Sequence, residues 1–418
     1  MNGAMIRSPC NMSAARGSAS EGFVNALDIK ADQAVEHRLL HRDPLAYCAH
    51  PHLTAAKTDN WLLVFTQSLR RDLILHPPQD PFYCNMLMRS EDQGLSWGPP
   101  AIVPAPRWHG VECAGLTALR SGRILLNQWR FDWYPLDHAR RHLNPEDYDP
   151  PEKLMGPSAM AAELVDWAPD PLTIAQCFPW ARGKGQTWIH RSDDGGRTFA
   201  HSSRIDTRPL SGGYGIRGAI ELPDGEIILP LCDVPHYRNV FVVRSRDGGE
   251  SWSGPEPVAG AEGHEFEEPA PLLLISGRLI MLLRDNRSRI LHLVRSEDEG
   301  HSWTVPRATG IIDYPAHLLE LPDGRIVCVT GRRAPPFGIM LYVSEDGGET
   351  WGCDRPMIVC AGFPNRDLGY PTMALRSDGS LFIAYYGQDA NGVTGIHASI
   401  LRPQAIAPAP RKDINGRN

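Results

Sequence analysis

The sequence SRDGGESW, residues 245–252, decides the fold, because four variants of it occur elsewhere in the chain. They read SEDQGLSW from Ser90, SDDGGRTF from Ser192, SEDEGHSW from Ser296 and SEDGGETW from Ser344. The five copies start 102, 53, 51 and 48 residues apart, so one repeat period runs through the chain and one unit is enlarged. A period of about 50 residues is typical of propellers and solenoids.

Each copy, called the turn motif below, has the chemistry of a tight turn between two strands. Its glycine adopts the positive φ that other residues resist, and its aspartate accepts backbone N–H groups across the turn. The closing Trp or Phe re-enters a strand and packs beneath the turn. We therefore interpret Asp92, Asp247, Asp298 and Asp346 as structural rather than catalytic.

A second repeat alternates with the first and consists of two apolar strands joined by a tight turn, usually Asp-Gly or Ser-Gly. Its six copies start at Leu53, Gly115, Arg217, Ala270, Ala316 and Thr372. In five of the six units a turn motif follows, which gives four strands per unit, the content of a propeller blade. The sixth unit ends near Leu401 without the motif, so we expect strand material from about residues 37–47 to close the ring. The sequence predicts an all-β, six-bladed β-propeller with one partly helical insertion.

We expect a single propeller domain over residues 36–402, with flexible segments before it, 1–35, and after it, 403–418. The insertion in the enlarged unit, residues 131–188, is rich in Pro and Ala and has a weak helical pattern. A lid over the channel, a subunit contact and a passive excursion are all compatible with its sequence.

Composition narrows the class of protein. The net charge of -7 gives no reason to expect a nucleic-acid partner, and no stretch approaches the roughly 20 apolar residues of a membrane helix. The nine cysteines form no Cys-x-x-Cys pair, and the first residues lack an apolar run. We expect a cytoplasmic protein without a membrane partner; the sequence does not indicate an oligomeric state.

Polar and aromatic residues gather where the predicted strands reach the rim opposite the turn motifs. Each blade contributes some of them, and six blades converge on one axis, which favours a sugar-binding mouth. The candidates for substrate contact at this rim include Glu112, Arg130, Arg217, Glu267, His50, His52 and His109. His50 and His52 share one face of a strand, but no third ligand has a diagnostic spacing, so we expect no metal and no cofactor.

Residues 45–400 resemble the sialidase (neuraminidase) family, whose six-bladed propellers carry such motifs as Asp-boxes. LGYPTMALRSDGSLFIAYY is similar to the sialidase segment with the tyrosine nucleophile, which falls on Tyr370. FEEPAPLLLISGRLIMLLRDN is similar to the segment with the assisting glutamate, here Glu268 or Glu267, and a carboxylate-binding arginine, here Arg284. The resemblance implies a retaining exo-glycosidase for sialic acid or a related ulosonic acid, with tyrosine in place of a second carboxylate.

Two further positions follow from the same resemblance. VTGRRAPPFGIMLYVSEDGG places another arginine of the family's triad at Arg332 or Arg333, and Asp80 stands where the acid/base aspartate precedes the first motif. The chain departs from the family at YCAHPHL, residues 47–53, where sialidases have the triad's first arginine. Arg217 or Arg130 is then the candidate to supply the missing charge.

The departure leaves two alternatives to the sialidase hypothesis. One is a propeller hydrolase or lyase for a uronic acid, with His50, His52 or His109 as acid/base. The other is a propeller that binds glycans without catalysis. A convergence of Tyr370, Glu268 and Asp80 on one pocket separates the last from an enzyme.

Overall fold

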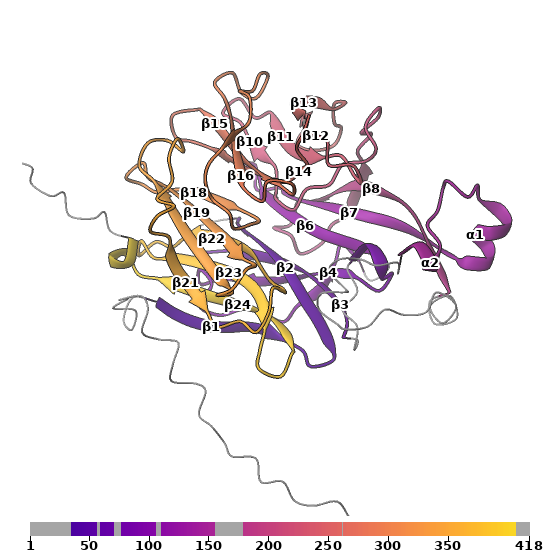
Figure 1. Cartoon of the computed structure of the whole chain (residues 1–418), viewed down its shortest axis with the longest axis horizontal. Helices are drawn as coiled ribbons and strands as arrows, with labels where there is room; N and C mark the ends of the chain where they lie inside the picture. Colours follow the sequence, from indigo (N-terminus) through magenta and orange to yellow (C-terminus); the bar gives the residue numbers. More distant parts are fainter. Residues whose placement is uncertain are drawn as a thin grey trace, which may run out of the picture.

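The computed structural model describes residues 35–56, 59–70, 77–105, 110–154, 179–260 and 262–406. The described strands form six four-stranded sheets, which stand as blades around one axis (Figure 1). The six-bladed propeller predicted from the sequence is confirmed. Every neighbouring pair within a blade is antiparallel, as expected for strands joined by short turns.

The blades follow the order of the chain, and the first strand of each lies innermost. The first three blades are β2 (Ala46–Ala55), β3 (Trp61–Leu69), β4 (Cys84–Ser90) and β5 (Ala101–Val103); β6 (Val111–Ala118), β7 (Ile124–Pro135), β8 (Trp180–Ser192) and β9 (His201–Arg204); and β10 (Ile220–Glu221), β11 (Ile227–Cys232), β12 (Asn239–Ser245) and β13 (Glu256–Gly260). The next two are β14 (Phe266–Leu273), β15 (Leu279–Asp285), β16 (Leu291–Ser296) and β17 (Arg307–Ala308); and β18 (His317–Glu320), β19 (Ile326–Arg332), β20 (Gly338–Ser344) and β21 (Met357–Ala361).

The sixth blade joins the two ends of the propeller. It contains β22 (Leu368–Leu375), β23 (Leu381–Gln388) and β24 (Thr394–Leu401), and its outermost strand is β1 (Val35–Arg42). β1 pairs antiparallel with β24 from Val35 opposite Leu401 to Arg42 opposite Gly395. Because the third and fourth strands of this blade come from opposite ends of the chain, no turn connects them, and this explains why the sixth unit has no turn motif.

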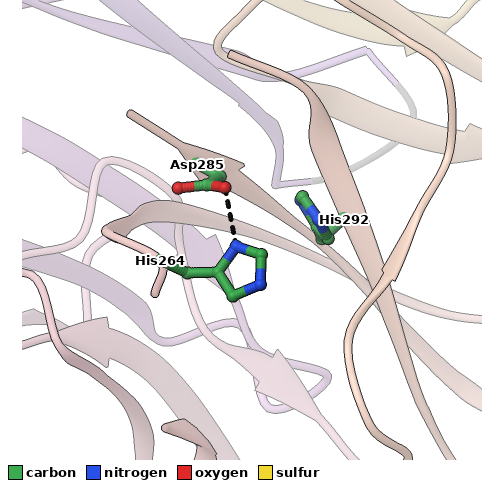
Figure 2. Close-up of side chains that lie close together, drawn as sticks. All are labelled: His264, Asp285 and His292. Atoms are coloured by element: carbon green, nitrogen blue, oxygen red, sulfur yellow. Dashed lines mark hydrogen bonds and ion pairs between the residues drawn. The ribbon is translucent and has the colours of Figure 1, made fainter. Parts of the chain in front are cut away.

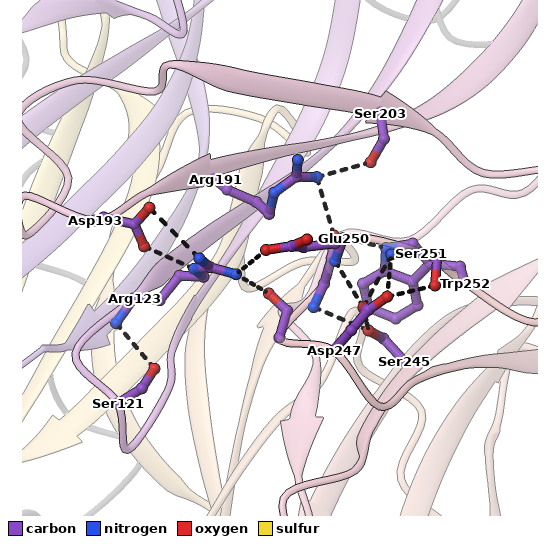
Figure 3. Close-up of polar contacts among 12 residues, drawn as sticks. Ser121, Arg123, Arg191, Asp193, Ser203, Ser245, Asp247, Glu250, Ser251 and Trp252 are labelled. Carbon is purple, nitrogen blue, oxygen red and sulfur yellow. Dashed lines mark hydrogen bonds and ion pairs between the residues drawn. The ribbon is translucent and has the colours of Figure 1, made fainter.

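The turn motifs all connect the third and fourth strands of a blade, so they share one rim. In the copy shown in Figure 3, Ser245 Oγ donates to Asp247 at 2.8 Å and accepts the N–H of Gly249 at 2.9 Å. The Asp247 carboxylate accepts the N–H of Ser251 at 2.9 Å, and Trp252 Nε1 donates to the Gly249 carbonyl at 3.3 Å. The same serine, aspartate and glycine contacts recur in the other four copies. The structural interpretation of the motif aspartates agrees with these contacts.

An arginine directly before four of the motifs links each blade to the next. Arg89 donates to the Gly195 carbonyl at 2.7 Å, Arg191 to the Gly249 carbonyl at 3.1 Å and Arg244 to the Glu299 carbonyl at 3.2 Å. Arg295 forms an ion pair with Glu349 in the same direction around the ring. Each of the contacted motifs therefore stabilises its own hairpin and also binds the arginine of the preceding blade.

The insertion differs from the expected range 131–188. Strand β7 continues to Pro135 and β8 starts at Trp180, and the two stay paired from Phe131 opposite Gly185 to Pro135 opposite Trp180. This hairpin projects from the ring and carries the helices α1 (Leu136–His142) and α2 (Pro151–Leu154) (Figure 1). Residues 155–178 lie outside the described part.

The expected end segments are only partly described. Residues 1–34 and 407–418 lie outside the described residues, whereas Pro403–Ile406, expected in the flexible tail, form the short 3₁₀ helix η2. Ile406 is buried in that helix, which explains its order. A second 3₁₀ helix, η1 (Pro77–Gln79), precedes β4. Among the described helices, none combines the length and apolar character that a membrane span requires.

Candidate active site

Three inner strands carry the same local irregularity, a register slip with a proline inside it, at the rim opposite the turn motifs. The register slips between Ala49 and His52 in β2, between Glu267 and Ala270 in β14 and between Gly369 and Thr372 in β22. The residues inside these bulges are His50-Pro51, Glu268-Pro269 and Tyr370-Pro371. A β-bulge leaves a residue unpaired and re-aims its side chain, so each strand presents one side chain toward the axis.

The bulge residues have a backbone conformation that is rare outside glycine. The φ angles are 55° at His50, 51° at Glu268 and 47° at Tyr370. Non-glycine residues in this region cost of order 1–3 kcal/mol each, and they persist where the surrounding structure requires them. Three such residues at one rim mark it as the candidate active site.

Tyr370 and Glu268 meet across the axis. The Tyr370 hydroxyl donates a short hydrogen bond to Glu268 Oε1, and both side chains are buried. Burial and the Glu268 carboxylate raise the pKa of Tyr370 well above its ordinary value. Burial alone would raise the pKa of Glu268, but the Arg284 guanidinium and the Tyr370 hydrogen bond hold it below its usual value. The shared proton therefore rests on the phenol, and the carboxylate beside it is ionised.

Arg284 binds two adjacent carboxylates from the paired strand. Its Nη1 lies 2.8 Å from Glu268 Oε2 and 2.9 Å from Glu267 Oε1, and its guanidinium carbon lies 4.2 Å from the centre of the Tyr314 ring. Burial raises the pKa of Glu267 despite this cation. The two glutamates proposed as alternatives for the assisting base thus share one arginine, and Glu268 is the one that contacts Tyr370.

Arg332 and Arg333 point to different surroundings. The Arg333 guanidinium carbon lies 5.2 Å from the centre of the Tyr370 ring, and Arg333 donates to the Tyr386 hydroxyl at 3.1 Å. Arg332 instead faces the buried Asp313, with Nε 3.4 Å from its carboxylate. The structure brings Arg333 to the site and places Arg332 in an ion pair outside it.

Arg217 lies deep in the same region. It donates to the Ala316 carbonyl at 2.6 Å and the Pro371 carbonyl at 3.1 Å, while Nη1 has no hydrogen-bond partner among the described residues. Burial lowers the pKa of Arg217 to about 10, which leaves it charged at neutral pH. Arg130, the other candidate for the missing charge, lies with its guanidinium carbon 5.7 Å from the centre of the Trp188 ring in the second blade.

The histidine candidates also differ in their surroundings. The His50 ring meets the Tyr370 ring edge-on, with ring centres 4.4 Å apart. His52 accepts the N–H of Leu116 through Nδ1 at 2.9 Å, and burial keeps its pKa well below the ordinary value. His52 is therefore a neutral link between the first two blades. His109 lies outside the described residues.

Glu112 adds a third buried carboxyl group to this region. It lies in the irregular part of β6, where the register slips between Val111 and Ala114. Burial, followed by the charges of Glu267 and Glu268, raises the pKa of Glu112 to about 8. The carboxyl group is therefore protonated at neutral pH, which limits the negative charge beside Glu267 and Glu268.

Asp80 is buried on the connection between β3 and β4. It accepts Ser68 Oγ at 3.0 Å and the N–H of Phe82 at 3.0 Å. Its charge also helps raise the pKa of Tyr83, after burial, together with Asp367, Tyr386 and Glu112. Asp80 is thus held by Ser68 and Phe82, and its charge acts on Tyr83.

The projecting hairpin holds the segment in front of Asp80. Arg182 of β8 donates to the Pro78 carbonyl at 2.9 Å, and Gln79 donates to the Leu154 carbonyl of α2 at 2.9 Å. The described part of the insertion therefore packs on η1, up to the residue that directly precedes Asp80.

Sequence reasoning assigned no role to a second buried carboxylate network. Asp367 accepts the Tyr47 hydroxyl at 2.9 Å and the Tyr386 hydroxyl at 3.2 Å, and burial raises its pKa. Tyr386 in turn receives Arg333. Asp367 directly precedes β22, three residues before Tyr370, and this nearness in the sequence is the signal that could have found it.

Residues 156–383 match the BNR repeat-like domain family. An anhydrosialidase from Macrobdella decora is 35% identical over 85 residues, which are 20% of this chain and 11% of that protein. The chain thus spans about a tenth of the length of that relative.

Two solved structures share the fold. A protein of unknown function from Dyadobacter fermentans has a TM-score of 0.71 and 20% identity, over 88% of this chain and 99% of that one. A mutant of the NanB sialidase from Streptococcus pneumoniae has a TM-score of 0.62 and 10% identity, over 88% of this chain and 70% of that one. The family match covers more than half of the chain, so this protein belongs to the BNR repeat-like domain family.

Proposed function

We propose that this protein is a retaining exo-glycosidase that releases a terminal acidic sugar, sialic acid or a related ulosonic acid. The observation that carries the proposal is the hydrogen bond from the Tyr370 phenol to the ionised Glu268, with Arg284 and Arg333 beside the pair. Tyr370 and Glu268 are two of the three residues whose convergence distinguishes an enzyme from a propeller that only binds glycans. The similarity to sialidases supports the substrate class.

A phenol suits a substrate that carries a carboxylate on its anomeric carbon. An anionic nucleophile at 4 Å from that carboxylate meets a repulsion of about 4 kcal/mol at an effective dielectric of 20. Tyr370 is neutral until it reacts, because its pKa is raised, and this avoids the repulsion. As Tyr370 Oη attacks the anomeric carbon, its proton moves to Glu268, which already accepts the hydrogen bond.

Arg333 and Arg284 are the cations that recognise the substrate carboxylate. Both lie beside Tyr370, and the planar guanidinium group pairs with carboxylates through two parallel hydrogen bonds. Arg217 contributes the third charge in place of the arginine absent from residues 47–53. Its Nη1 is buried and without a hydrogen-bond partner among the residues the structure describes.

Asp80 completes the reaction as acid and then base. It protonates the leaving glycosidic oxygen while the bond from the anomeric carbon to Tyr370 Oη forms. In the second half Asp80 takes a proton from water, the water oxygen attacks the anomeric carbon, and Tyr370 leaves and recovers its proton from Glu268. Two displacements at one carbon give net retention of configuration.

An assay on aryl glycosides tests the substrate class. The panel contains aryl glycosides of sialic, other ulosonic and uronic acids, and the first-formed sugar is read by NMR. We expect turnover of the ulosonic acids, with the product released first in the configuration of the substrate. Turnover confined to uronic acids would replace the proposal by the histidine-based alternative, with His50 beside Tyr370 as its first candidate.

Tyr370→Phe tests the nucleophile. The variant keeps the buried ring and removes the reacting oxygen, so activity falls by several orders of magnitude while the fold persists. Tyr385→Phe is the matched control, because it removes a buried phenol of the same blade that bonds to Ser399 Oγ at 2.7 Å. If Tyr370→Phe keeps most of its turnover, the tyrosine mechanism is wrong.

A further inference from the structure

A cluster of two imidazoles and a carboxylate stands at the site rim of the fourth blade. His264 precedes β14 by two residues, Asp285 ends β15 and His292 is the second residue of β16. Three adjacent strand ends of one sheet thus bring them together, as Figure 2 shows. One ligand atom from each side chain lies within 4.8 Å of the others.

We propose that His264, Asp285 and His292 bind a divalent transition-metal ion of the zinc type. His264 Nδ1 lies 2.8 Å from Asp285 Oδ2, and the ion takes the place of the proton between them (Figure 2). His292 Nδ1 donates to the Ile290 carbonyl at 3.1 Å, which fixes the neutral tautomer with its lone pair on Nε2. Metal-binding histidines commonly donate their second ring nitrogen in this way.

The three proposed ligands differ in burial, so they differ in their freedom to move. Asp285 and His292 are buried, whereas the side chain of His264 is 39% exposed and precedes its strand. Atoms bound to zinc at about 2.0 Å stand roughly 3.3 Å apart in a tetrahedron. His264 therefore makes most of the inward movement, and the fourth position faces the solvent on its side.

The buried Phe266 forms one wall of the cluster. Its ring stacks on the His264 ring at 5.0 Å between ring centres and meets the His292 ring edge-on at 5.3 Å. The three rings fix the directions of the two imidazoles. Without an ion, Asp285 also organises the turn by accepting the N–H groups of Glu265 at 2.9 Å and Arg287 at 3.1 Å.

The chemical types of the three ligands determine which ions the site prefers. Two imidazoles and one carboxylate suit zinc and its neighbours, whereas calcium and magnesium prefer oxygen ligands throughout. The ion would also fasten the strand ends that carry the site, because Phe266 pairs with Asp285 and Glu267 pairs with Arg284 in the same ladder. The binding itself does not depend on the proposed glycosidase function.

Calorimetric titration of the chelator-treated, untagged protein with Zn²⁺ tests the site. We expect one ion per chain, and an affinity at least about tenfold lower in His264→Ala and in His292→Gln. The matched control is His301→Ala, an exposed histidine of the same blade on the opposite rim. The melting midpoint should rise with Zn²⁺ in the wild type and in the control, and stay unchanged in His264→Ala.

Three results would overturn the site. One is a wild-type affinity no higher than that of His264→Ala, another is an equal loss in His301→Ala, and the third is no binding at all. His264→Ala keeps the test valid if His292→Gln fails to fold, because the His264 side chain is the exposed member of the cluster.

Discussion

Arg332 and Arg333 are adjacent in the chain, yet only Arg333 lies against Tyr370, while Arg332 pairs with Asp313. A charge-assisted hydrogen bond is worth about 1.5 to 3 kcal/mol, so we expect Arg333→Ala to weaken turnover of the acidic substrate by roughly ten- to a hundredfold or more. Arg332→Ala removes the same charge one residue away and should change kcat/KM little. Steady-state kinetics on the acid and its methyl ester make the comparison.

The comparison of the acid with its methyl ester distinguishes a loss of charge recognition from damage to the fold. The wild type should prefer the acid, and Arg333→Ala should process acid and ester at similar rates. Equal losses in Arg332→Ala and Arg333→Ala, or a wild type that does not distinguish acid from ester, would mean that Arg333 does not recognise the carboxylate.

The burial of Glu112 should make the free energy of unfolding depend on pH. Its pKa is raised to about 8 in the folded protein, whereas an unfolded glutamate ionises near 4.3. Between these values the folded chain holds a proton that the unfolded chain has lost, so the stabilising contribution is complete below about pH 4 and lost as pH rises toward 8. Glu112→Gln removes this dependence.

The measurement is the free energy of unfolding of both proteins in urea from pH 5 to 9. The wild type should lose stability relative to Glu112→Gln by up to about 1.4 kcal/mol per pH unit below pH 8, and the difference should level off above it. Gln is close to Glu in shape, so a difference independent of pH would show that Glu112 is not protonated in the folded state.

At the scale of elements, the turn motif supports the hairpin on the rim away from the site. Asp247→Ala removes the acceptor for Ser251 and Ser245 Oγ, and we expect a loss of about 1–3 kcal/mol in the free energy of unfolding with kcat unchanged. Asp224→Ala is the control, because Asp224 accepts one N–H, from Glu226, in the first turn of the same blade. A smaller loss in Asp247→Ala than in Asp224→Ala would contradict the role of the motif.

The blades could be predicted from the sequence because their signals are local. Each turn motif fixes a hairpin through contacts within eight residues, and the six copies of the two-strand repeat that alternates with it predicted the number of blades. The longer extent of β7 and β8 was missed, because FDWYP has no alternating pattern and its strand character comes from pairing with residues 180–185. Local patterns do not report such pairing.

The site was harder to predict because it depends on contacts between blades. The choice between Glu267 and Glu268, or between Arg332 and Arg333, is decided by which neighbour points to the axis. A bulge reverses that direction, and the residue before proline at Glu268 and Tyr370 was the visible signal for one. The His264, Asp285 and His292 cluster joins three strand ends, and their spacing in the sequence matches no metal motif.

At the scale of the whole molecule, the ring is closed by β1, which comes from the other end of the chain. Besides pairing with β24, β1 donates from Arg38 to the Leu95 carbonyl of the first blade at 2.8 Å, and Arg42 pairs with Asp389 at 2.7 Å. Without β1 the edge of β24 is open, and an unpaired edge is a template for association with other chains.

We therefore compare a chain that starts at Val35 with one that starts at Asp43 and lacks β1. The shorter chain loses the backbone hydrogen bonds of one strand, each worth about 1 kcal/mol, so its melting midpoint should fall and it should aggregate as concentration rises. A peptide of residues 35–42 should restore the midpoint, because it offers β24 the partner it has lost, whereas a scrambled peptide should not. If the two chains melt alike, β1 is an accessory strand, and the other three strands of the sixth blade hold the ring closed by themselves.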